Sequence, residues 1–153
     1  MADEMLSPQQ QAWGKKRLRR FMVVNGVSVA FLMENTLILY AIRNGLSDPL
    51  VAVLASFIHL TMPFMILGKR LVAARGLAST WSLGWLLRCL SASIMIAAPL
   101  VPETLFELRV AVILLGAFGF ALFRAVGSVS MTPLLGEVTT SRDRGRFISG
   151  NFL

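Results

Sequence analysis

The chain has 153 residues, of which 56% are hydrophobic and 15% are charged, and its mean hydropathy is +0.69. Soluble domains are about 45–50% apolar and about 25% charged, so this composition excludes an ordinary soluble domain and indicates a membrane protein. The net charge of +7 comes from short cationic runs between apolar stretches. That pattern is typical of membrane topology signals and does not resemble a nucleic-acid surface.

Residues 1–20 form a polar head that ends in a basic run. Trp13 precedes Lys15, Lys16 and three arginines, and tryptophan beside cations is typical of the membrane interface. The apolar run that follows contains Glu34 and lacks a small-residue cleavage site, so we expect a retained helix and not a signal peptide. We therefore predict a cytoplasmic, interfacial segment over 1–20.

Four apolar stretches follow the polar head, and each is long enough to cross a bilayer as a helix, which takes about 20 residues. They cover about 21–42, 50–67, 80–101 and 108–131. Pro63 is expected to kink the second, because proline removes one intrahelical hydrogen bond. Their apolar runs are continuous and not alternating, which excludes lipid-spanning strands. The sequence thus predicts an all-α membrane protein with a four-helix transmembrane region over 21–136.

Lysines and arginines are distributed unequally between the predicted loops. The amino-terminal head carries five, and the loops near residues 70 and 143 carry three each, whereas the two other loops hold only Arg43 and Arg109. Positively charged loops stay on the cytoplasmic side. We therefore expect an integral protein of the cell (inner) membrane with its amino terminus in the cytoplasm.

The last segment, 137–153, is predicted to be a cytoplasmic loop followed by the start of a fifth helix at Phe147. Seven residues of helix, 147–153, are only about 10 Å long and cannot cross a bilayer. We therefore expect a short stub of an incomplete fifth helix, and a fragment whose carboxy-terminal helices are missing.

The first predicted span contains polar residues at membrane depth. Glu34 is followed by Asn35, and Asn25 lies on an earlier turn close to the same face. An ionisable group at this depth costs several kcal/mol unless it is paired, hydrated or protonated. Glu34 is either a cavity-facing carboxylate that accepts a proton or contacts solute, or a structural group bonded to a neighbouring helix.

Two arginines lie inside predicted spans and are candidate partners of Glu34. Arg88 is expected to extend toward the cytoplasmic surface, since arginine stems are long. Arg124 is favoured for a functional or packing role because small residues follow it. Gly116, Ala117, Gly119, Ala121 and Ala125 also give the fourth span a small-residue face suited to close helix packing.

The region from Arg124 onward resembles the major facilitator superfamily. The matching residues are Arg124 with Gly127 and Ser128 after it, then Glu137, and then Asp143-Arg144-Gly145-Arg146 before the next helix. The loop Gly68–Gly76 keeps glycines and cations of a second family motif but lacks its aspartate. The chain is therefore similar to the first four helices and the start of the fifth of such a transporter.

This resemblance implies a partial major facilitator-type bundle and the transport of a small solute, with H⁺ as a candidate coupling ion. Asn25, Glu34, Asn35 and Arg124 would line the pathway. The loop residues Glu137, Asp143, Arg144, Gly145 and Arg146 would latch one conformation. The fragment is expected to be inactive by itself, because the family holds its solute between two halves of the complete protein.

No catalytic motif, metal-ligand spacing or cofactor motif is present in the sequence, so we expect no enzyme, metal or cofactor. The expected partners are the lipid bilayer, the solute and the missing carboxy-terminal helices, and not nucleic acid. Two alternatives stay open. One is a small four-helix proton-coupled multidrug exporter that acts as a dimer through Glu34. The other is a non-transporting membrane assembly subunit.

Overall fold

A computed structural model of the chain describes residues 6–32, 34–140 and 143–152, without the side chains of 27–32, 34 and 150–152. The described residues are helical and contain no strand, as the sequence predicts. They divide into two compact units. Unit 1 combines 1–33 with 131–153, and unit 2 is the continuous segment Glu34–Ser130.

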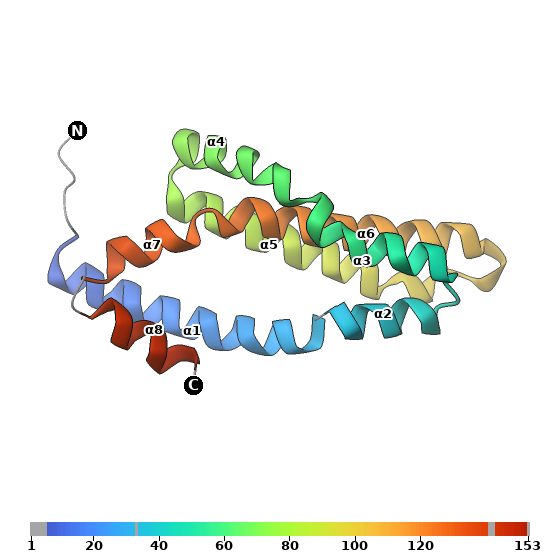
Figure 1. Cartoon of the computed structure of the whole chain (residues 1–153), viewed down its shortest axis with the longest axis horizontal. Coiled ribbons are helices and arrows are strands. Elements are labelled where there is room, and N and C mark those ends of the chain that lie inside the picture. Colours follow the sequence, from blue (N-terminus) through green and yellow to red (C-terminus); the bar gives the residue numbers. More distant parts are fainter. Residues whose placement is uncertain (1–5, 33, 141–142, 153) are drawn as a thin grey trace. The chain divides into compact units, whose positions relative to one another are not determined.

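Unit 1 contains helices α1 (Pro8–Leu32), α7 (Met131–Val138) and α8 (Arg144–Phe152), with α1 in contact with both others (Figure 1). Helix α1 begins inside the segment that we predicted only as a polar head. Its start is a capping box: the Gln10 backbone N–H donates to Ser7 Oγ at 3.3 Å, and the Ser7 backbone N–H donates to Gln10 Oε1 at 2.8 Å. Pro8 then occupies the first helical position, which suits its fixed φ.

Unit 2 contains α2 (Glu34–Arg43), α3 (Asp48–Leu60), α4 (Met65–Arg75), α5 (Leu77–Ile96) and α6 (Phe106–Ser128). Short 3₁₀ turns lie at Met62–Phe64, Ala98–Leu100 and Glu103–Leu105. The antiparallel pair α5 and α6 forms the centre, and α3 and α4 pack on α6 (Figure 1). The small-residue face of α6 is confirmed, since Gly116, Ala117, Ala121 and Ala125 are buried.

Proline separates α3 from α4, as predicted. Pro63 is the second residue of the 3₁₀ turn Met62–Phe64, and the Phe64 N–H donates to the Thr61 carbonyl at 3.1 Å. The buried Thr61 hydroxyl donates to the Phe57 carbonyl at 2.8 Å, which satisfies a group near the break. Gly76, with a φ of 82°, then makes the turn from α4 into α5, a conformation that side chains with a Cβ rarely adopt.

Three helical stretches are long and apolar enough to cross a membrane: Asp48–Arg75, Leu77–Leu100 and Glu103–Val138. They correspond to the second, third and fourth predicted spans. The stretch that corresponds to the fourth predicted span extends to Val138, beyond the predicted end at 131, because α7 follows α6 closely. Pro133 does not prevent this, since it falls in the first turn of α7, where proline is tolerated. The first predicted span is divided between α1 and α2, on either side of residue 33, and stays a prediction.

Large apolar side chains remain exposed along these three stretches. Leu86 of α5 is 67% exposed and Leu115 of α6 is 71% exposed. Contiguous apolar surface of this kind is rare on soluble monomers. The exposed faces therefore suit contact with lipid or with further helices.

Candidate functional site

Arg88 lies near the middle of α5 and is buried against two aromatic rings. Its guanidinium carbon is 4.2 Å from the ring centroid of Trp85, one turn earlier on α5, and 4.4 Å from that of Phe120 on α6. Only 5% of the residue is exposed. The sequence led us to expect this side chain at the membrane surface. Instead, the quadrupoles of the two rings attract the cation and hold it between the helices.

Arg124 lies one turn beyond Phe120 on α6, and it is exposed in the structure. Helix α5 contains no Asp or Glu, and α6 contains only Glu107, in its first turn. Neither arginine therefore has a carboxylate of α5 or α6 close to it along its own helix.

The other predicted pathway residues fall in different units. Asn35 is exposed at the start of α2 in unit 2, and Asn25 is half-buried on α1 in unit 1. The side chain of Glu34 lies outside the described residues. Its predicted pairing with an arginine therefore stays a prediction, as does the exporter mechanism that depends on it.

Among the predicted latch residues, Asp143 is the centre of a hydrogen-bond network in unit 1. The Asp143 carboxylate accepts hydrogen bonds from the backbone N–H of Thr140 at 2.7 Å and from its hydroxyl at 2.8 Å. It also forms an ion pair with Lys15 of α1. These bonds place a carboxylate at the amino terminus of α8, where the helix dipole favours negative charge.

Hydrogen bonding from Lys15, followed by that from Thr140, lowers the pKa of Asp143 to about 2. The carboxylate is therefore ionised throughout the neutral range. It connects α1 to the start of α8 within unit 1. Sequence analysis did not single out Lys15 among the basic residues of the head, because nothing in that run distinguishes it from Lys16.

The remaining latch residues make fewer contacts. Arg144 Nε donates to the Thr139 hydroxyl at 3.2 Å, which joins α8 to the end of α7. Glu137 is exposed, and its carboxylate forms no ion pair within the described part of the chain. A Cβ added to Gly145 would meet nothing within 4 Å, and Arg146 is exposed. The latch role of these residues stays a prediction.

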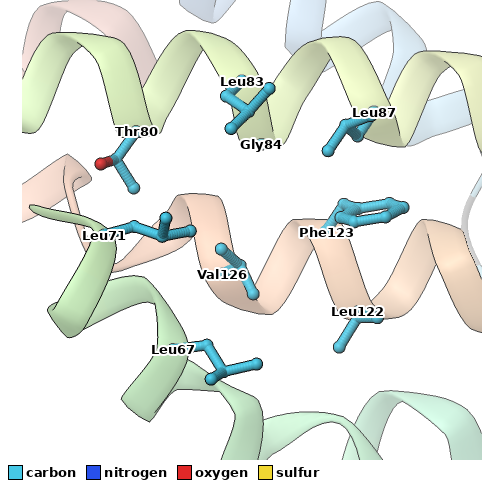
Figure 2. Close-up of a pocket in the computed structure, with 9 residues that line it drawn as sticks. All are labelled: Leu67, Leu71, Thr80, Leu83, Gly84, Leu87, Leu122, Phe123 and Val126. Atoms are coloured by element: carbon cyan, nitrogen blue, oxygen red, sulfur yellow. The ribbon is translucent and has the colours of Figure 1, made fainter. Parts of the chain in front are cut away.

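A cavity of about 150 Å³ opens between α4, α5 and α6 in unit 2, and we call it the α4–α5–α6 groove (Figure 2). Its lining is apolar and comes from leucines of all three helices together with Phe123 and Val126 of α6. Its one polar side chain, Thr80, donates its hydroxyl to the Gly76 carbonyl at 2.9 Å. The groove thus suits an apolar occupant. Sequence periodicity did not predict it, since it arises from the divergence of α4.

Among the residues that the structure describes, no three His, Cys, Asp or Glu side chains come together as they would to hold a metal ion. No protein-family model, curated protein or solved structure matches this chain. The class of protein is therefore defined by the fold alone: an all-α protein with three helices long and apolar enough to cross a membrane.

Proposed function

We propose that this chain is part of a secondary transporter of the major facilitator type, which moves a small solute across the cell membrane. The proposal is supported by the apolar helices and by the resemblance of Arg124, Gly127 and Ser128, and of the Asp143–Arg146 loop, to that family. It places the amino terminus in the cytoplasm, in agreement with the unequal distribution of lysine and arginine over the loops.

The burial of Arg88 is the observation that carries this proposal. Arginines within membrane helices are costly, and they mark pathways for solutes, ions or protons. An arginine held by Trp85 and Phe120 places a positive charge between α5 and α6, near the middle of α5. We infer that the solute, or the coupling group that accompanies it, is anionic. Glu34 is the candidate intramolecular carboxylate.

The Asp143 network supports a second part of the proposal, in which the loop before α8 biases one conformation. It joins α1 to the start of α8 through Lys15 and Thr140. A transporter that alternates between inward-open and outward-open states needs contacts that exist in only one of them. Loss of the Lys15–Asp143 pair would then change the distribution between the two states and leave the solute site intact.

The first test is the nucleotide sequence that follows codon 153. The proposal expects an open reading frame with seven or more further hydrophobic spans. The product of that frame is then reconstituted in liposomes, and uptake of radiolabelled lactate, succinate and inorganic phosphate is measured.

Uptake of at least one of these anions is expected, with loss of more than tenfold in Arg88→Met and no change in Arg43→Gln, which removes an exposed cation at the end of α2. Uptake that survives Arg88→Met would refute the role of Arg88. If no further spans follow in the reading frame and no uptake is measured, the transporter proposal is refuted and an assembly subunit is favoured.

A further inference from the structure

The α4–α5–α6 groove combines an apolar interior with a cationic end. On α4, Leu67 and Leu71 face the groove, and Arg75 follows Leu71 by four residues (Figure 2). Residues four apart lie on the same face of a helix. Arg75 therefore continues the groove-facing row of α4, and it is exposed where this helix ends.

The cation at this end has no carboxylate close to it in sequence, since the sequence contains no Asp or Glu between Asp48 and Glu103. Arg75 forms no ion pair with a described residue. Lys69 and Arg70 are also exposed on α4, but they lie on other faces of that helix than Leu67 and Leu71. The end of the groove therefore offers positive charge for a partner outside the described chain.

The interior of the groove offers water few hydrogen-bond partners, because aliphatic and aromatic side chains line it. The one hydroxyl in the lining, that of Thr80, already donates to the Gly76 carbonyl. The chemistry of the lining thus favours a hydrocarbon occupant.

Two glycines keep the groove from closing by a simple shift of the helices. Gly68 brings α4 against the Val126 carbonyl of α6, and Gly84 brings α5 against Gly127 of α6. The backbones are already in contact at these positions, so α4 and α5 cannot approach α6 further there. The α4–α5–α6 groove beside these contacts is therefore a fixed feature of unit 2.

We propose that the groove binds an anionic phospholipid, with one acyl chain against Leu67, Leu71 and Leu87 and the phosphate group at Arg75. The hydrocarbon lining selects an acyl chain, and the unpaired charge at its end selects an anionic head group. A zwitterionic lipid would occupy the same hydrocarbon surface but gain less from the cation. This inference needs only a membrane location and is independent of the transport proposal.

Native mass spectrometry of the full chain tests the head-group preference. The chain is equilibrated with equal amounts of phosphatidylglycerol and phosphatidylcholine that have identical acyl chains. Retained phosphatidylglycerol should exceed phosphatidylcholine by at least fivefold, and Arg75→Gln should reduce that ratio about fivefold. Arg43→Gln, which removes a cation from the opposite end of the helices, should leave the ratio unchanged. Equal retention of both lipids by the unmodified chain would overturn the proposal.

Substitutions that fill the groove with a larger side chain test whether the acyl chain binds there. Leu71→Trp should abolish lipid retention, whereas Leu86→Trp, on the exposed face of α5, should retain it. Full retention in Leu71→Trp with unchanged helix content would overturn the acyl site.

A photoactivatable acyl chain in phosphatidylglycerol gives a second measurement on the unmodified protein. Crosslinks should concentrate in 65–75 and 77–87. Uniform labelling that includes Leu115, or crosslinking of a second copy of the chain at Leu71, would overturn the lipid assignment.

Discussion

Gly84 and Gly127 bring the backbones of α5 and α6 into direct contact: a Cβ built on Gly84 would lie 2.7 Å from the Cα of Gly127. Real Cβ atoms do not approach backbone this closely, so neither a rotamer change nor a flexible neighbour can relieve the clash. This crossing sets the separation of the two central helices of unit 2, and Arg88 lies one turn beyond it on α5.

Gly84→Ala is therefore expected to force α5 away from α6 and to destabilise the chain by about 1–3 kcal/mol, the range for an overpacked contact. Gly26→Ala is the matched control, because a Cβ at Gly26 of α1 meets nothing within 4 Å. That change should be neutral or stabilising by about 0.5–1 kcal/mol through helix propensity. Reversible unfolding in detergent, followed by circular dichroism, compares them. Equal stability of both variants would contradict this crossing.

Arg88→Met tests whether Arg88 serves stability or activity. Removal of a buried ion also removes its desolvation cost, and methionine keeps apolar contact with the two rings. The variant is therefore expected to unfold at the same or higher temperature than the unmodified chain. Arg88→Ala should instead lose about 2 kcal/mol or more, because it leaves a cavity beside Trp85 and Phe120. A marked loss of stability in Arg88→Met would make Arg88 a structural residue.

The pKa of Asp143 predicts a specific pH dependence for unit 1. The pKa is about 2 in the folded chain, largely through Lys15, against about 3.9 in an unfolded chain. A lowered carboxyl pKa stabilises the folded state fully above about pH 4, and the contribution is lost as the pH falls through about 2. Lys15→Gln should raise the pKa toward its ordinary value, as read from the Asp143 carboxyl carbon by NMR. Lys16→Gln, at an exposed neighbour, should not; an equal rise in both would show that the pair is absent.

The first predicted span is testable by labelling single cysteines in a Cys89→Ser background. If residues 21–42 cross the membrane, Gln9→Cys and Ser47→Cys lie on opposite sides, and Ala74→Cys lies on the side of Gln9. An impermeant maleimide should then label Ser47→Cys in intact cells and the other two only after permeabilisation. Labelling of Gln9→Cys and Ser47→Cys from the same side would reduce the number of spans to three.

Much of unit 2 could be predicted from sequence because its determinants are local. Apolar runs of sufficient length located three spans, Pro63 located the break between α3 and α4, and the glycine–alanine spacing located the buried face of α6. Each signal lies within one continuous segment of the chain, and the chemistry of its residues acts directly on the backbone or on packing.

The missed features depend on neighbours that are distant in sequence or on a signal that was overlooked. The burial of Arg88 requires Phe120 on another helix, so its own surroundings favoured an extended side chain. The groove requires the relative paths of α4, α5 and α6. The start of α1 was different, since Ser7, Pro8 and Gln10 carry a recognisable helix-start pattern that the basic composition of the head obscured.

The pairing of Lys15 with Asp143 also constrains the order in which the chain assembles during synthesis. The two residues are 128 positions apart, so α1 emerges from the ribosome long before its carboxylate partner exists. Unit 2 is continuous in sequence and lies entirely between them. Its helices can therefore associate while the chain is still being made, whereas unit 1 can close only after translation has passed Asp143. During that interval the basic amino-terminal helix is available to the targeting and insertion machinery.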